Sequence, residues 1–212
     1  MISFQDFVLE SRANDTQKTQ VATTEGTYRK TGEFLKPKLG ENSRVINVGA
    51  GLDQTKRGLQ SGLGHGHVVH DMEPNPEKRK TPPEFTAAHE IPNNHYHAAV
   101  CHNVLNVVEP EVRHQVVRTI FDSLRQGGHA VIGTRKWTGD ISKTKNFEHG
   151  EEPKSVWVNK NGAYSYQKGF DGDELKDYIE GEARKYGHEV EVKKVNGIAA
   201  NAVHVRMIKK GS

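Results

Sequence analysis

Short apolar runs alternate with amphipathic stretches along most of this chain. Apolar residues dominate Arg44–Val48, His67–Glu73 and Ala98–Cys101, and each run is the length of a strand. Between Glu111 and Leu124, valine, isoleucine and leucine instead recur every three or four residues, which is the spacing of one helix face. We therefore expect strands that alternate with helices, a pattern typical of βαβ units and a mainly parallel sheet.

The same criteria predict the remaining elements. Asn161-Gly162 lies between two short apolar segments and indicates a β-hairpin. The final two strands are expected to form an antiparallel pair. Further helices are predicted over residues 2–11, 27–35, 53–61 and 173–186, and further strands over 85–88, 129–134, 190–195 and 202–208.

Composition narrows the class of protein. The chain has 212 residues, which is typical of one domain, and no segment approaches the ~20 apolar residues of a membrane helix. The single cysteine, Cys101, excludes a disulfide scaffold. The opening residues carry no basic segment typical of a secretory signal, and the single cysteine fits a reducing compartment, so we expect a cytoplasmic protein. The balance of 30 basic and 27 acidic residues does not by itself indicate nucleic-acid binding.

The first motif with chemical meaning is RVINVGAGLD, at residues 44–53. A strand, a glycine turn and a helix in this order form nucleotide sites in parallel sheets. Glycine lets the backbone turn and approach a ligand, and the following helix offers free N–H groups. Gly49 and Gly51 are the two turn glycines, and Asp53 stands where a third glycine is common.

An acidic residue at the end of the next strand is the second motif. Carboxylates about 20 residues beyond the glycine turn accept hydrogen bonds from ribose hydroxyls. Asp71 and Glu73 are both candidates. We favour Glu73, because it directly precedes Pro74, where the strand should end.

Two more segments complete a resemblance to a known family: CHNVLNVVEPE at 101–111 and LRQGGHAVIGT at 124–134. With the glycine turn and the strand-end acid, they resemble class I S-adenosylmethionine (SAM)-dependent methyltransferases over about residues 40–210. Asn47 departs from that pattern, because the family often has an acid there. The segment at 24–30, the NVLNVV run and YQKGF at 166–170 look like a group met among bacteriophage and bacterial proteins.

This resemblance implies an α/β, Rossmann-like class I methyltransferase fold. Its mixed seven-stranded sheet would have an antiparallel C-terminal strand. Residues 1–40 would be an N-terminal helical lead and 41–212 the methyltransferase domain. The implied cofactor is S-adenosyl-L-methionine. The implied cofactor-binding residues are Tyr28, Gly49, Ala50, Gly51, Glu73, Glu90 and Asn103.

The resemblance points less sharply to the methyl acceptor. His102 and Asn106 are the catalytic candidates after the fourth strand. We favour a small-molecule acceptor, because HNVL replaces the tetrad of DNA amino-methyltransferases and Val100, not proline, precedes Cys101. A nucleic-acid or protein acceptor stays open. The candidate substrate-binding residues are Arg135, Trp137, Tyr166 and Lys168.

The sequence also bears on two other classes of function. The Asn47 and Asp53 departures keep open a non-catalytic regulatory or scaffold protein that binds SAM or S-adenosylhomocysteine. A Rossmann-like dehydrogenase is disfavoured by the LRQGG segment and the antiparallel tail. The 12 histidines show no convergent pairing typical of zinc, so we expect no metal. No membrane partner is expected, and the sequence does not specify the oligomeric state.

Overall fold

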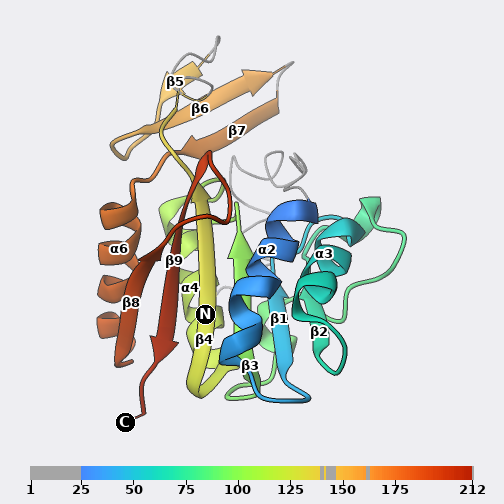
Figure 1. The fold of residues 1–212 in the computed structure, drawn as a ribbon. Helices are drawn as coiled ribbons and strands as arrows, with labels where there is room; N and C mark the ends of the chain where they lie inside the picture. The colour runs from blue at the N-terminus through green and yellow to red at the C-terminus, as the bar shows by residue number, and fades with distance from the viewer. Residues whose placement is uncertain (1–24, 139–140, 142–146, 161–162, 212) are drawn as a thin grey trace.

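The main sheet of the computed structural model contains six strands in the order β2-β1-β3-β4-β9-β8 (Figure 1). The structure describes residues 25–138, 141, 147–160 and 163–211. β1 pairs in parallel with both β2 and β3, β3 pairs in parallel with β4, and β9 is antiparallel to both of its neighbours. The strands are β1 (Arg44–Val48), β2 (Val68–Met72), β3 (Tyr96–His102), β4 (Leu124–Arg135), β8 (Val190–Val195) and β9 (Ala202–Lys209).

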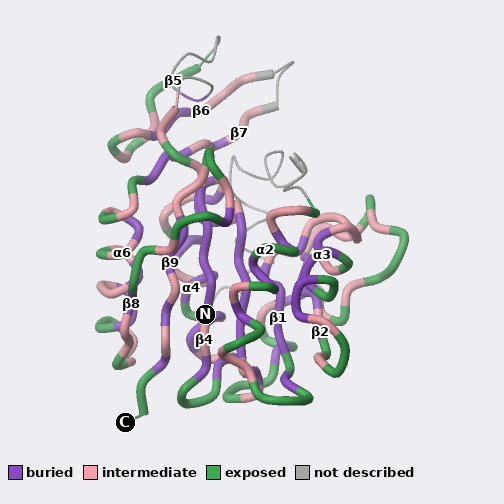
Figure 2. The backbone as a smooth tube through the Cα atoms, in the orientation of Figure 1, coloured by how far each residue is buried: buried purple, intermediate pink, exposed green. Residues whose placement is uncertain are grey.

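Helices cover both faces of this sheet and create two apolar cores. Alternate strand residues point to opposite faces. Val45 and Val100 therefore belong to the core beneath α2 and α3, and Ile46 and Cys101 belong to the core beneath α4 and α6. Burial is densest along β1, β3 and β4 (Figure 2). The helices are α2 (Glu25–Leu35), α3 (Asp53–Leu63), α4 (Pro110–Ser123) and α6 (Gly172–Lys185), with short 3₁₀ helices η2 (Lys36–Lys38), η3 (Pro76–Lys78) and η4 (Ala88–Glu90).

Close glycine contacts join α2 to α3. A Cβ atom on Gly32 would lie 2.6 Å from the backbone oxygen of Leu59. A Cβ on Gly62 would overlap the backbone oxygen of Arg29, and one on Gly58 that of Glu25. The two helices can approach so closely only because these positions lack side chains. Residues 25–35 of the predicted N-terminal lead therefore pack against α3, one of the helices that cover the main sheet.

The order of the strands predicts a ligand crevice at one edge of the sheet. The chain runs from β1 outward to β2 and then returns to the other side of β1 to form β3. In open α/β sheets, ligands bind at the carboxyl ends of the strands where the order reverses in this way. The end of β1 is therefore the place to look for a site.

A second, three-stranded antiparallel sheet lies beyond the carboxyl ends of the parallel strands (Figure 1). Its strands are β5 (Phe147–His149), β6 (Ser155–Lys160) and β7 (Ala163–Lys168). This insertion follows β4 and returns to α6, and a bridge between Lys136 and Phe170 closes its base. The predicted hairpin is thus present, and its Asn161-Gly162 turn lies outside the described residues.

One predicted strand is wrong. Over 85–88 the chain forms a single bridge, Met72 to Phe85, so the seventh strand of the main sheet is reduced to one residue pair. The amides of Thr86 and Ala87 donate to the Glu90 carboxylate instead of to a neighbouring strand, which turns the chain into η4. The predicted helix over 2–11 lies outside the described residues. Within the described part of the chain, no helix is long and apolar enough to cross a bilayer.

Candidate active site

The glycine turn after β1 is tied to the end of β2. The amides of Gly49 and Ala50 both donate to the carbonyl of Met72, at 2.9 and 3.0 Å. Gly49 and Gly51 have φ of 69° and 64°, values that residues with a side chain rarely adopt. A Cβ on Gly49 would overlap Val104, whereas a Cβ on Gly51 would meet no heavy atom within 4 Å. Space therefore opens beside Gly51.

Glu73 faces this turn from the end of β2. One carboxylate oxygen accepts the Gly51 amide at 2.6 Å and the other accepts the Asn75 amide at 3.0 Å. The residue is only 6% exposed, and this burial raises the pKa of the carboxyl, although the two amide bonds partly oppose the rise. A carboxylate oxygen has two lone pairs, so each can accept one more donor.

Asp71, the alternative acid, points into the protein. It is fully buried, and its two oxygens contact Arg79 and Asn47. Burial raises the pKa of the Asp71 carboxyl, while its bonds to Arg79 and Asn47 act in the opposite direction. The geometry thus supports Glu73 over Asp71 as the acid that faces the crevice.

The two departures from the family pattern have structural partners. Asn47 donates to Asp71 at 3.0 Å and lies 3.3 Å from the hydroxyl of Thr55, which itself lies 2.7 Å from the Ala50 carbonyl. Asp53 accepts the backbone amides of Lys80 and Thr81, at 2.9 and 3.0 Å. Both polar side chains hold segments around the glycine turn in place.

The loop between β3 and α4 contacts the glycine turn from the other side. Asn103 adopts φ of 59°, and its amide donates to the Gly133 carbonyl at 2.8 Å. Val104 fills the space left by the missing side chain of Gly49. Asn106 is fully buried and its carbonyl accepts the Lys168 amide at 2.8 Å, while its side-chain amide has no hydrogen-bond partner among the described residues.

His102 lies in a buried polar layer between the sheet and α2. Its Nε2 is 2.8 Å from the hydroxyl of Thr31, and its ring meets Tyr28 and His204 edge-on at 5.1 and 5.2 Å. Burial lowers the pKa of His102 well below its ordinary value, and nearby His204 adds to the effect. The imidazole is therefore neutral at physiological pH, and one of its nitrogens is already engaged.

Tyr28 and Glu90, two predicted cofactor residues, differ in burial. Tyr28 is 1% exposed, and burial followed by the charges of Cys101, Asp71 and Glu73 raises the pKa of its hydroxyl. Glu90 is exposed and accepts the amides of Thr86 and Ala87, which lowers the pKa of its carboxyl. The partners of Glu90 thus come from the turn that leads into η4.

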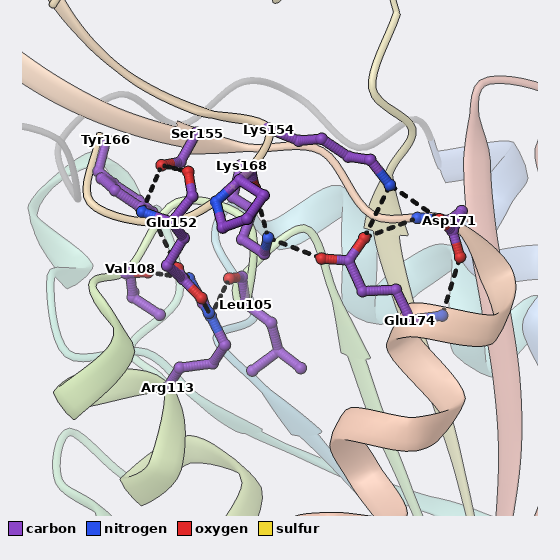
Figure 3. A network of polar contacts seen from close by, with 11 residues as sticks. Leu105, Val108, Arg113, Glu152, Lys154, Ser155, Tyr166, Lys168, Asp171 and Glu174 are labelled. Carbon is purple, nitrogen blue, oxygen red and sulfur yellow. Dashed lines mark hydrogen bonds and ion pairs between the residues drawn. The ribbon is translucent and has the colours of Figure 1, made fainter. Parts of the chain in front are cut away.

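The four predicted substrate residues divide into two pairs. Tyr166 donates to Glu152 at 2.6 Å, and Lys168 donates to Glu174 at 2.8 Å, so these two buried side chains have internal partners (Figure 3). Arg135 and Trp137 are only partly buried, at and just beyond the carboxyl end of β4. Burial lowers the pKa of the Arg135 guanidinium. The second pair thus lies where the main sheet meets the insertion.

Sequence reasoning missed Arg113. This arginine of α4 is 1% exposed. Its guanidinium donates to the carbonyls of Leu105 and Val108, at 2.8 and 3.1 Å, and to Glu152 at 2.9 Å (Figure 3). It thereby joins the β3–α4 loop to the insertion. The available signal was its place three and four residues before Val116 and Val117, on the apolar face of the helix.

No metal centre is built from the histidine runs that the structure describes. His70 contacts the Tyr96 hydroxyl at 2.8 Å, and His97 accepts the Arg44 amide at 3.1 Å. Among the described residues, no three histidine, cysteine, aspartate or glutamate side chains are grouped to hold an ion.

No model of a known protein family matches this sequence, and no curated protein matches it. Solved structures do match the fold. A SAM-dependent methyltransferase from Clostridium acetobutylicum aligns over 92% of this chain and 94% of its own, with 9% identity and a TM-score of 0.59. The 1,6-didemethyltoxoflavin-N1-methyltransferase of Burkholderia thailandensis, solved with 1,6-didemethyltoxoflavin and S-adenosylhomocysteine, aligns over 99% and 87%, with 18% identity and a TM-score of 0.57.

A third similar structure is named as a different class of enzyme. It is described as a zinc-dependent alcohol dehydrogenase from Rhodobacter sphaeroides and aligns over 90% of this chain and 100% of its own, with 11% identity and a TM-score of 0.64. Identities this low show the fold alone. The fold is thus the Rossmann-like α/β fold shared with class I SAM-dependent methyltransferases.

Proposed function

We propose that this protein is a SAM-dependent methyltransferase. The observation that carries the proposal is the pairing of Gly51 with Glu73 at the end of β1. Gly51 borders open space, and its amide is bonded to a buried carboxylate that retains acceptor capacity. This pairing lies where the strand order reverses, which is the ligand position of such sheets.

The residues of this site suit a nucleoside cofactor. Glu73 would accept hydrogen bonds from the ribose hydroxyls, and Gly51 would provide backbone that no side chain obstructs. Gly49 and Ala50 stay proposed backbone contacts of the cofactor. Bound SAM supplies a methyl group already activated on a sulfonium. The protein therefore has mainly to orient the acceptor and exclude water. Asn103, Tyr28 and Glu90 stay proposed cofactor contacts.

We favour a small-molecule acceptor. The Burkholderia enzyme was solved with a small molecule bound, and this chain has a comparable length. Cys101 does not suit covalent attack on a base, because burial raises the pKa of its thiol to about 12. Arg135 and Trp137 are the proposed acceptor contacts that remain partly accessible. Tyr166 and Lys168 would need to exchange their present partners before they could contact an acceptor.

His102 and Asn106 remain the proposed catalytic residues. His102 is neutral, and the atom that would accept a proton is Nδ1, which has no partner among the described residues. Burial, which lowers the pKa of His102, opposes that step. Asn106 offers a side-chain amide that no other described residue bonds. A nucleic-acid or protein acceptor, and a non-catalytic SAM- or S-adenosylhomocysteine-binding role, are the alternatives. A cytoplasmic location, which would be the host cytoplasm for a phage-encoded protein, remains a prediction.

Isothermal titration with S-adenosylhomocysteine tests the proposal. We expect micromolar binding to the parent protein and its loss in Glu73→Ala, with Glu73→Gln intermediate because an amide keeps one acceptor. Glu77→Ala is the matched control, because Glu77 is an exposed acid close to Glu73 in the chain. Absence of binding at millimolar ligand, or binding of NAD in its place, would contradict the proposal. Turnover with candidate acceptors then separates an enzyme from a non-catalytic binder.

A further inference from the structure

Arg79 is a buried arginine that reaches the glycine turn from a neighbouring segment. It follows η3 directly, and its side chain is 1% exposed, although arginine is mostly found on protein surfaces. The guanidinium donates to the Gly51 carbonyl at 2.9 Å, to Asp71 at 2.5 Å and to the Thr81 carbonyl at 3.1 Å. A single side chain thus joins the turn, the end of β2 and the segment after η3.

Gly51 is consequently fixed at both polar atoms of its backbone. Glu73 accepts its N–H, and Arg79 donates to its C=O. Gly51 has no side chain to anchor it, so these two bonds determine how its peptide groups face the crevice. Asp53 strengthens the arrangement, because it accepts the amides of Lys80 and Thr81, directly after Arg79.

The guanidinium also offsets negative charge at the site. Glu73 and Asp71 are both buried, and the Arg79 charge lowers the pKa of each carboxyl against the upward effect of burial. Tyr28 from α2, Asp53 and Lys56 from α3 and Cys101 from β3 also act here, and Asp53 lies 4.0 Å from the Arg79 guanidinium. The Tyr28 hydroxyl interacts with both acids and Arg79, while Lys56 interacts with Asp71 and pairs with Glu84 at 2.5 Å.

We infer that Arg79 is a positioning residue of the nucleoside site. It orients the Gly51 peptide and keeps Glu73 available as a charged acceptor for a vicinal diol. The inference rests on the proposed function for the identity of the ligand, but the contacts that carry it are those of the protein alone. Planar guanidinium geometry matters here, because three different acceptors are bound by one fork of donors.

Two variants of Arg79 separate charge from geometry. Arg79→Gln removes both, so we expect S-adenosylhomocysteine to bind about tenfold or more weakly, the scale of a lost charged hydrogen bond. As the pH is lowered, Arg79→Gln should also lose S-adenosylhomocysteine binding at a higher pH than the parent does, because Glu73 protonates more readily in the variant. Arg79→Lys keeps the charge, so its pH profile should stay close to that of the parent while affinity falls. Arg118→Gln, an exposed arginine on α4, is the matched control.

A second readout needs no ligand. The titration of the Glu73 carboxyl can be followed by carbon NMR in the free protein, with Glu73→Gln to assign the signal. We expect a higher Glu73 pKa in Arg79→Gln and little change in Arg118→Gln. An unchanged Glu73 titration and unchanged pH profile in Arg79→Gln would overturn the inference. If the parent binds no S-adenosylhomocysteine but its Glu73 pKa depends on Arg79, the proposed function fails and the charge coupling stands.

Discussion

Gly49 and Gly51 share a left-handed backbone but differ in their surroundings. An alanine at Gly51 should cost about 1–2 kcal/mol of unfolding free energy, the backbone term alone, because its Cβ would enter open space. An alanine at Gly49 should cost about 1–3 kcal/mol more, because its Cβ would overlap Val104. Urea unfolding of both variants measures the difference.

Val104→Ala supplies the control for that comparison. Removing the valine methyl groups should recover part of the loss in Gly49→Ala and none of the loss in Gly51→Ala. Equal costs for the two glycine variants, or an equal recovery in both, would show that steric overlap with Val104 does not distinguish them.

Individual site residues were predictable where a motif fixes their position. Glu73 follows from its place at the end of a strand, and the structure directs it to Gly51 as expected. The partners of Asp53 were not predictable, because they are backbone amides of a segment 27 and 28 residues away. Arg79 gave no signal for the same reason: its contacts depend on how an irregular segment folds back over the turn.

At the scale of elements, the Arg113–Glu152 pair holds the insertion to the main domain. Glu152→Gln leaves a buried guanidinium without its counter-charge, so we expect a loss near the lower end of about 3–5 kcal/mol, because Glu152 is itself 27% exposed. Urea unfolding measures this cost. Glu151→Gln, the neighbouring exposed residue, is the control. A loss as small as that of the control would show that the pair does not fasten the insertion.

Element boundaries were predictable where the apolar period is regular. The helix predicted over 111–124 occupies Pro110–Ser123, and the final strand pair forms as expected. The strand predicted over 85–88 failed because one side chain, Glu90, takes the amides that a strand would need. The role of Arg113 depends on Glu152, 39 residues further along, so a single amphipathic helix could not reveal it.

At the scale of the whole molecule, buried histidines should make stability fall in mild acid. Burial lowers the pKa of His204 to about 4, from an ordinary value of 6.5, and lowers that of His102 as well. The contribution of His204 is therefore complete above about pH 6.5 and is lost as the pH falls toward 4. For His204 alone this is on the order of 3 kcal/mol.

The acids of the site change stability in the opposite direction. Burial raises the pKa of Asp71 and Glu73, so protonation of these carboxyls as the pH falls favours the folded state. Between about pH 7 and pH 5, the unfolding free energy of the parent should therefore decline relative to that of His204→Gln. His65→Gln, an exposed histidine, is the control. Parallel pH profiles for the parent and His204→Gln would contradict this account.

The most direct test of the central claim is a crystal structure with S-adenosylhomocysteine. We predict that the nucleoside lies at the carboxyl ends of β1 and β3, beside Gly51, with both ribose hydroxyls bonded to Glu73. We also predict that Arg79 retains its bond to the Gly51 carbonyl. Ligand density at another edge of the sheet, or a ribose that does not contact Glu73, would contradict the assignment of this crevice as the cofactor site.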